Sequence, residues 1–516
     1  MPPFVELRLW LREGPRGERA LTAAIAAVVL TVFVAALVPV ASDTGGASTL
    51  AGSVAQPVQG ASAPADSTGT SPLPGSAPGV PGTSPRLAGP GVVPQGPGTT
   101  GAQRPTPAPG GSISSPECAT VQASAPGVTP KTVLLDVANI SLAGPVGNST
   151  FDVRPDLAKI AQALADDINE RGGVACGRKL VLKQYDVNPL DANDSQSKCL
   201  QMAADKPFLV LNVGAYLGPA SRQCFVKAKV LELSGTQVDK AEVASSYPYL
   251  FTVTAVAEQM VDAAIFGLAK RGMFSGSKFA KLGLFEDGCD PPVNKQIARD
   301  LAKVGLKASQ ISTYVLECNV ASPPNQIEQG VLQHKLDNVT HVLLASSETN
   351  GQNYVRIARG QNFGPQYLVS DYGSNTSGAG TQNWGPSFDG AIGITTSRVG
   401  EFSSGIRNLE EVACDKALRK HGVRGIEAEN KDTSALADCD AFWLIRQAMS
   451  RAGSNPTQLS FLHGLSTMGL FRSAGLGDGR FTAAGKVTGG DFQREIVYRS
   501  SCGCWKIIDR TMSPVG

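Results

Sequence analysis

Short apolar runs alternate, over most of the chain, with stretches whose apolar residues recur at helical spacing. The first such run covers residues 133–137, and the stretch after it places Leu157, Ile160 and Leu164 on one face of a helix. Two series of β–α–β units predict two parallel, doubly wound sheets, because right-handed crossovers put helices on both faces of each. The expected strands are 133–137, 179–182, 208–213, 230–233, 249–254, 281–285, 311–316, 341–345 and 366–369. The expected helices are 157–168, 196–204, one from 219, 256–270, 293–304, 324–336 and 353–361.

The length of this region and the net charge of the whole chain limit the classes of protein that this sequence can represent. About 380 residues follow residue 131, which is enough for two domains of ordinary size. The net charge is +2 and no concentrated basic stripe is visible, which argues against nucleic acid as the main partner.

An apolar run without a charged residue occupies residues 20–40. About 20 such residues cross the hydrocarbon core of a bilayer, so the run predicts a transmembrane helix. Its preceding basic residues are Arg8, Arg12, Arg16 and Arg19. The positive-inside bias therefore places residues 1–19 in the cytoplasm and the long C-terminal part outside, as a single-pass protein of the cell membrane. The alternative is a cleaved signal peptide and a secreted chain, since Ala41 and Ser42 permit cleavage.

Residues 41–126 are a mixture of glycine, proline, serine, alanine and threonine with few bulky apolar side chains. Such a segment cannot bury enough surface to offset its conformational entropy. The sequence therefore predicts a disordered linker between the apolar helix and the folded region.

Cysteine usage agrees with export. The chain has ten cysteines, all beyond the apolar run. Disulfides persist in oxidising compartments. A zinc site needs suitably spaced cysteine and histidine ligands, and the four histidines are scattered. We therefore expect disulfides and no bound metal.

Polar loops follow the expected strands. In open α/β sheets, ligands bind beyond the carboxyl ends of the strands, and the residues there are rich in glycine, serine, threonine and asparagine. These side chains and backbones offer hydrogen bonds and close approach to a small polar solute. The loops cover residues 139–149, 214–219, 234–237, 286–290, 346–350 and 370–376.

Three segments carry a specific resemblance. SLAGPVGN at 141–148, DINERGGV at 167–174 and GRKL at 177–180 resemble the N-terminal lobe of type I periplasmic binding proteins. The most similar subgroup is the branched-chain amino-acid (leucine/isoleucine/valine) binding family of ABC transporter substrate-binding proteins. Tyr185, Asp186 and Asp191 follow the second strand, where that family has paired acids. The resemblance covers about residues 129–509, which is the whole folded region expected from its length.

The resemblance implies two Rossmann-like lobes joined by three crossover strands, with a ligand trapped between them by a hinge motion. The crossings are expected near 251–254, 394–397 and 480–482. Lobe 1 is then 127–252 plus 398–479, and lobe 2 is 253–396 plus 480–512.

The family's binding positions can be carried over one residue at a time. Asp371 falls where the family places an acid that pairs with the ligand's ammonium group, and a buried carboxylate needs such a partner. The loop at 215–218 departs from the serines and threonines that grip the ligand carboxylate in the family. The expected ligand-binding residues are Asn148, Ser149, Tyr216, Leu217, Thr236, Gln237, Asp290, Glu348, Thr349, Asp371 and Tyr372.

The lobe assignment also suggests three disulfides. Cys199 and Cys224 lie on successive helices, Cys289 and Cys318 follow neighbouring strands, and Cys414 and Cys439 bracket a loop between two helices. The pairing of the remaining four stays open; they are Cys118, Cys176, Cys502 and Cys504.

The function implied by the resemblance is capture of a small polar, amino-acid-like solute and its delivery to the permease of an ABC importer. One alternative is a sensory module that reports to a membrane partner, and a second is a hydrolase on the same fold. No G-x-S-x-G elbow, P-loop or H-E-x-x-H motif occurs, and the glycines of 475–479 lack the spacing of a dinucleotide site. We therefore expect no catalytic residues and no cofactor.

Overall fold

The computed structural model describes residues 118, 120–141, 154–189, 191–213, 217–319, 321–378, 380–482 and 485–515. The predicted anchor at 20–40 and nearly all of the predicted linker lie outside these residues. Within the described residues, no helix has both the length and the apolar character needed to cross a membrane. The described residues all belong to one compact unit, Thr100–Gly516.

The first sheet has five parallel strands in the order β2-β1-β3-β4-β5, as the β–α–β pattern predicts. Its strands are β1 (Thr132–Ile140), β2 (Lys179–Val187), β3 (Leu209–Asn212), β4 (Leu231–Ser234) and β5 (Leu250–Thr252). The helices between them are α4 (Leu157–Glu170), α5 (Ala192–Asp205), α6 (Pro219–Ala228) and the short α7 (Lys240–Ser246), which the sequence analysis did not predict.

The second sheet is mixed. Its parallel part has the order β7-β6-β8-β9-β10, and β13 and β14 extend it in antiparallel fashion. The strands are β6 (Leu282–Asp287), β7 (Ile311–Leu316), β8 (His341–Ala345), β9 (Gln366–Ser370), β10 (Ile392–Thr395), β13 (Phe492–Arg499) and β14 (Cys504–Ile507). Its helices are α8 (Ala257–Lys270), α9 (Pro291–Lys303), α10 (Pro324–Leu336) and α11 (Glu348–Gly360). The expectation of a purely parallel second sheet is thus corrected. β13 runs antiparallel to β10 because the chain re-enters this sheet beside the end of β10, and a tight turn after β13 then forms the hairpin with β14.

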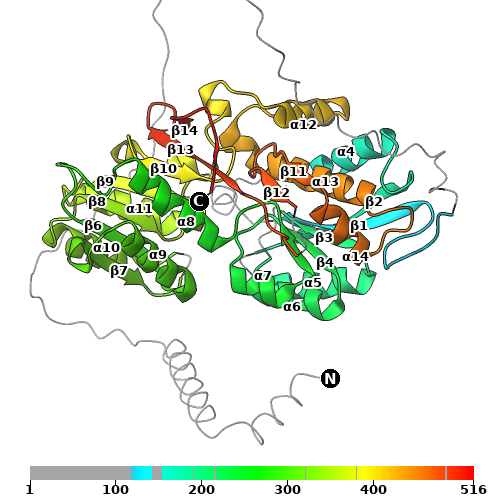
Figure 1. The fold of residues 1–516 in the computed structure, drawn as a ribbon, viewed down its shortest axis with the longest axis horizontal. Helices are drawn as coiled ribbons and strands as arrows, with labels where there is room; N and C mark the ends of the chain where they lie inside the picture. The colour runs from blue at the N-terminus through cyan, green and yellow to red at the C-terminus, as the bar shows by residue number, and fades with distance from the viewer. Residues whose placement is uncertain are drawn as a thin grey trace, which may run out of the picture. The chain divides into compact units, whose positions relative to one another are not determined.

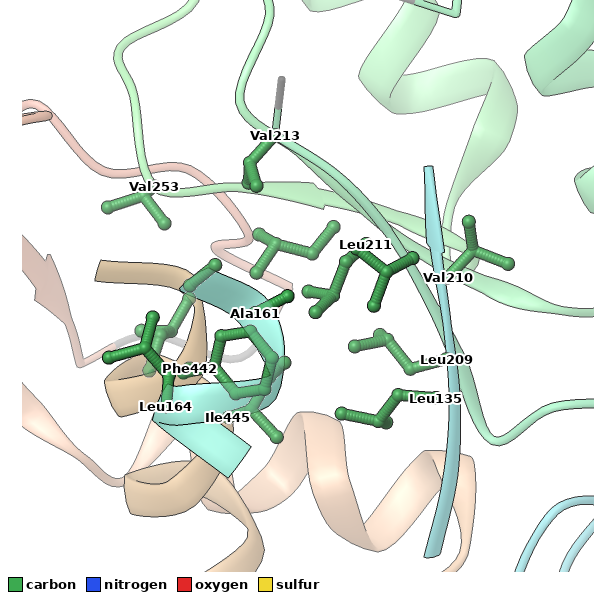
Figure 2. Packing of buried hydrophobic residues seen from close by; sticks show 14 of the residues in the cluster. Leu135, Ala161, Leu164, Leu209, Val210, Leu211, Val213, Val253, Phe442 and Ile445 are labelled. Atoms are coloured by element: carbon green, nitrogen blue, oxygen red, sulfur yellow. The ribbon is translucent and has the colours of Figure 1, made fainter. Parts of the chain in front are cut away.

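The C-terminal helices return to the first sheet (Figure 1). They are α12 (Leu409–Lys420), α13 (Glu429–Arg451) and α14 (Gln458–Ser466), followed by the small antiparallel pair β11 (Gly469–Phe471) and β12 (Gly479–Phe481). Figure 2 shows Leu135 and Leu209 of the sheet facing Phe442 of α13, with Ala161 of α4 beside them. All four side chains are fully buried, so α4 and α13 cover one face of this sheet.

The hydrophobic cores divide the chain into two lobes. The first lobe, as used below, is the first sheet with α4–α7, α12–α14, β11 and β12; the second lobe is the second sheet with α8–α11. The chain passes from the core of the first lobe to that of the second between Val253 and Ala255, and it returns to the first lobe after Val399. Phe481 and Val487 still belong to the first core, so the third change falls later than the expected 480–482. The reason is that β12 pairs with β11 and holds Phe481 against Phe471.

Five disulfides are formed, and no cysteine among the described residues is free. Cys199–Cys224, Cys289–Cys318 and Cys414–Cys439 are the three pairs suggested from the sequence. The pairs that the sequence left open are Cys118–Cys176 and Cys502–Cys504.

Candidate functional site

A cavity of about 180 Å³ lies at the carboxyl ends of strands from both sheets. In the first sheet it touches Ile140 at the end of β1 and Val213 just after β3. The strand order reverses between β1 and β3, and open α/β sheets bind ligands at this switch point. In the second lobe it is lined by the loops that follow β9 and β10. Residues of both lobes therefore line this one cavity.

The loop after β4 supplies a polar edge. The buried guanidinium of Arg222 donates to the hydroxyl of Thr236 (2.6 Å), which also lies 2.9 Å from the Ser234 hydroxyl. Gly235 stands between them, where a Cβ would lie 2.7 Å from the Cα of Val213, so only glycine lets β3 and this loop approach so closely. Gln237 accepts a hydrogen bond from the backbone N–H of Gly373 (2.9 Å) and so links the two lobes at the cavity.

Asp371, directly after β9, brings a carboxylate to the cavity. One of its oxygens accepts from the N–H of Thr396 (2.5 Å) and from the hydroxyl of the same residue (2.7 Å). The other oxygen accepts from the hydroxyl of Thr376. A carboxylate offers about four acceptor positions, so these three bonds fix its orientation and leave room for one more donor.

The remaining wall is largely apolar and comes mainly from the first lobe. It includes residues from the amino end of α4, from the first half of α13 and from the loop after β11. These apolar residues are Ile140, Leu157, Val213, Met260, Val399, Phe402, Leu436, Ala437, Ala474 and Leu476. A solute in this cavity would meet apolar groups on one side and hydrogen-bonding groups on the other.

A buried network of charges stands beside the second crossing. Arg398 donates to Glu401 (2.9 Å) and to both oxygens of Asp478 (2.6 and 2.8 Å). Arg494 on β13 also donates to Glu401 (2.5 Å). Burial disfavours the charge of Glu401, but the two arginines outweigh it and hold the pKa of this carboxyl below its usual range. The network ties the segment after β10 to the approach to β12 and to β13.

Asp440 on α13 shapes the loop that closes the apolar wall. Its fully buried carboxylate accepts from the hydroxyl of Ser473 (2.6 Å) and from the backbone N–H groups of Ala474 (2.5 Å) and Leu476 (2.8 Å). Burial raises the pKa of Asp440 to about 6, although these hydrogen bonds oppose the shift. The Asp440 carboxylate thus supplies acceptors for the backbone of this loop, within which the Ser473 hydroxyl also accepts from the N–H groups of Gly475 and Gly477.

Glu411 lies on the same side of the cavity, in the first turn of α12. It is only 2% exposed and pairs with Arg407. Burial raises the pKa of Glu411 to about 7 despite that pairing. Asn408 caps the helix by accepting from the Glu411 N–H (2.7 Å) and donates to Glu401 (3.0 Å).

Of the residues expected from the sequence, Thr236, Gln237 and Asp371 line the cavity. Leu217 is fully buried and does not line it. Its backbone N–H and carbonyl bond to the side chain of Asn212, which fixes the loop after β3 instead. Three further expected residues lie outside the described part of the chain; they are Asn148, Ser149 and Tyr216.

Four expected residues of the second lobe do not line the described cavity. Asp290 caps α9 by accepting from the Val293 N–H (3.3 Å). Glu348 accepts from Gln352 one turn further along α11 (2.9 Å), and Thr349 stands half-buried beside it, away from the cavity. Tyr372 is 4% exposed and packs in the second core, where burial raises the pKa of its hydroxyl.

The reason that these residues do not line the cavity lies at the switch point of the second sheet, between β6 and β8. Its side chains bind one another: Asp287 accepts from the N–H of Ser347 (2.6 Å) and from the amide of Asn350 (2.9 Å). The described cavity therefore meets the second lobe at the loops after β9 and β10. Sequence reasoning missed Arg398 and Glu401 because it treated 394–397 only as a crossing and did not examine the segment that follows β10. It missed the α13 wall because it examined only loops that follow strands.

The comparisons with known proteins agree with this architecture. Residues 140–493 match a family described as periplasmic binding protein. The search of curated proteins found no match.

Many solved structures share the fold at low sequence identity. A fatty acid ABC transporter substrate-binding protein from Thermomonospora curvata is similar over 76% of this chain and 95% of its own, with 16% identity and a TM-score of 0.57. A branched chain amino acid ABC transporter protein from Thermus thermophilus with bound valine is similar over 74% and 97%, with 16% identity and a TM-score of 0.56. A solute binding protein of an ABC transporter from Rhodopseudomonas palustris BisB5, in complex with 3,4-dihydroxy benzoic acid, is similar over 74% and 98%, with 12% identity and a TM-score of 0.55.

The family match runs from the end of β1 into β13 and so includes most strands of both sheets and all the residues that line the cavity. This chain belongs to the periplasmic binding protein family and has the fold of its type I members.

Proposed function

We propose that this protein is an extracytoplasmic solute-binding protein that captures one small amphipathic molecule between its lobes. The observation that carries the proposal is the cavity itself, to which the loops after β4, β9 and β10 and the apolar face of α13 all contribute. A ligand that touches both lobes stabilises the arrangement in which they meet, which is the basis of capture by hinge closure.

The size and lining of the cavity define the class of ligand. An engineered apolar protein cavity of about 150 Å³ holds a benzene molecule, so about 180 Å³ suits a solute of similar or slightly larger size. The apolar body of the solute would face Leu157, Leu436 and Leu476, and its polar head would face Asp371 and Gln237. A branched-chain or aromatic amino acid and a small aromatic acid fit this description.

Asp371 is the residue expected to distinguish an amino acid from an acid that lacks an amine. Its carboxylate has one acceptor position left after its bonds to Thr376 and Thr396, and an ammonium group would fill that position. We assign Thr236 and Gln237 to the same polar edge. Asn148, Ser149 and Tyr216 remain proposed contacts on the loops that follow Ile140 and Val213.

Delivery of the solute to the permease of an ABC importer completes the proposed function. The solved relatives named above are described as ABC transporter proteins, which supports this partner. The apolar run at 20–40 would keep the protein at the outer face of the membrane, where a captured solute is useful to a nearby permease. No catalytic step and no cofactor enters this proposal.

The test is a binding screen on the full chain with isothermal titration calorimetry and thermal unfolding. The probes are leucine, valine, phenylalanine, 3,4-dihydroxybenzoic acid and a medium-chain fatty acid. A solute present at 100 times its dissociation constant should stabilise the protein by about 2.7 kcal/mol. If none of these classes, nor a wider library of amino acids and small acids, shifts unfolding, solute capture is refuted.

The substitution Asp371→Asn then tests whether the polar head of the bound solute is an ammonium group. The neutral amide keeps the size of the carboxylate but loses its charge, so an amino acid should bind at least about tenfold more weakly. An acid without an amine should bind with unchanged or higher affinity. Asp290→Asn is the matched control: Asp290 follows a strand of the same lobe, lies outside the cavity, and can be replaced by asparagine as a helix cap. Equal effects of the two substitutions would remove Asp371 from the site.

A further inference from the structure

One disulfide differs from the other four in what it joins. Cys199–Cys224 connects α5 to α6, and Cys414–Cys439 connects α12 to α13. Cys289–Cys318 and Cys118–Cys176 likewise bridge segments that are far apart in the chain, with separations of 29 and 58 residues. Cys502 and Cys504 are only two residues apart, within the turn that joins β13 to β14.

The turn does not need this disulfide to hold its shape. The backbone N–H of Cys502 donates to the carbonyl of Arg499 (3.3 Å), and that of Gly503 donates to Ser500 (3.3 Å). The strands on either side are paired from Arg499–Cys504 to Ile496–Ile507. Trp505 anchors the hairpin in the core cluster that contains Phe388 and Tyr498, and it is 1% exposed. Because a disulfide restricts the unfolded chain less as its loop becomes shorter, this one constrains the chain least of the five.

The sulfur atoms of this turn are open to attack. Cys502 is exposed and Cys504 is half-exposed, whereas both cysteines of the Cys414–Cys439 pair are fully buried. Gly503 between them carries no side chain to shield the bond. Arg499 lies opposite Cys504 in the hairpin, and Lys506 follows two residues later. Positive charges near a cysteine stabilise its thiolate, which is the group that leaves when a disulfide is opened.

We propose that Cys502 and Cys504 form a thiol–disulfide exchange site that oxidises external thiols while the rest of the protein stays folded. The thiolate of an external thiol attacks the sulfur of Cys502, the Cys502–Cys504 bond breaks, and Cys504 leaves as a thiolate. A second external thiolate attacks the mixed disulfide at the external sulfur and releases Cys502. Two thiols thus become one disulfide, and the two electrons and two protons end on Cys502 and Cys504.

A graded reduction experiment locates the reactive bond. The full chain is equilibrated with a series of reduced-to-oxidised glutathione ratios, quenched with acid and alkylated, and its peptides are measured by mass spectrometry. Cys502 and Cys504 should become alkylated at ratios where the other eight cysteines stay protected and the unfolding temperature is unchanged. Opening of another disulfide first, or of all five together, would overturn the assignment.

A rate measurement tests the activity itself. A peptide with two reduced cysteines is mixed with the oxidised full chain, and closure of the peptide's disulfide is followed. The rate should fall by about tenfold or more in the Cys502→Ser/Cys504→Ser variant. Cys289→Ser/Cys318→Ser is the control, since Cys289 and Cys318 are also exposed but close a longer loop. If the control loses the activity and the first variant keeps it, the proposal is wrong. Neither experiment involves the solute, so the result is independent of the function proposed above.

Discussion

Glu401 is the residue whose replacement tests the buried charge network most directly. We consider Glu401→Gln, which keeps the shape of the side chain and an acceptor oxygen but removes the charge. The side chain of Glu401 is 5% exposed and that of Arg494 is 2% exposed. Arg398 keeps its contact with Asp478 in the variant, whereas Arg494 has no other acid partner among the ion pairs of the described residues.

The loss of stability expected for Glu401→Gln follows from the fact that Arg494 would lose its acid partner. Breaking a buried ion pair by removing one partner costs about 3–5 kcal/mol, because the remaining charge stays buried without compensation. Since glutamine still accepts hydrogen bonds, we expect the lower end of the range, about 3 kcal/mol. The pKa of Glu401 is held below its usual range, so the carboxylate stabilises the folded state at neutral pH. The difference in free energy of unfolding between the wild type and Glu401→Gln should therefore shrink as the pH falls below the ordinary glutamate pKa of about 4.3.

The measurement is urea denaturation at neutral pH, followed by tryptophan fluorescence. Glu495→Gln is the matched control, because Glu495 lies on the same strand but pairs with Arg271 at the surface, with 25% and 30% of the two side chains exposed. An exposed pair of this kind is worth about 1 kcal/mol or less. A second change, Arg494→Met, should recover much of the stability lost in Glu401→Gln, since it removes the stranded charge. Equal midpoints for the Glu401 and Glu495 variants would refute the reasoning.

Three further predictions concern stability and the cavity wall. Burial raises the pKa of Glu232 and of Asp438 to about 7, despite the nearby Arg222 and Arg154, so the folded state holds protons that the unfolded chain has released. The contribution of each group to stability should therefore fall as the pH rises from about 4 to 7, by about 3 kcal/mol for Glu232 and about 4 kcal/mol for Asp438. Relative to the wild type, Glu232→Gln should lose this pH-dependent contribution in thermal unfolding. Asp440→Ala should cost about 3–5 kcal/mol, because it removes an acceptor from the Ser473 hydroxyl and from three backbone N–H groups of the loop after β11, and calorimetry should show weaker solute binding. Gly489→Ala should cost about 1–3 kcal/mol in denaturation, because its Cβ would lie 1.9 Å from a backbone oxygen at the first crossing.

Local patterns were sufficient for most of the secondary structure. The expected helix at 324–336 and the expected strands at 311–316 and 341–345 agree with α10, β7 and β8 at both ends. The first turn of α11 was missed: the helix begins at Glu348, capped by Ser347, and the expectation began at 353. A cap depends on a single side chain and not on apolar periodicity, which explains the error.

The candidate site was predicted only in part. Thr236, Gln237 and Asp371 follow strands whose carboxyl ends meet at the cavity, so their positions after strands were enough to place them at its wall, and their contact with a ligand stays a prediction. Asp290 and Tyr372 follow strands in the same way, but one caps a helix and the other packs in the core. The position of a residue after a strand does not determine which way its side chain points, because that direction depends on the residues packed around it.

By itself, the sequence determined the β–α alternation, its two series of units and the polar loops, because each depends on residues close together in the chain. The family resemblance implied that residues 398–479 return to lobe 1. Only the tertiary structure decided that α13 packs on the first sheet beside α4, that Arg398 joins Glu401 to Asp478, and that Asp371 is held by Thr376 and Thr396. These contacts join segments that are distant in the chain, and burial makes them specific, since a buried charge or hydrogen-bonding group must find its partner wherever the packing provides one.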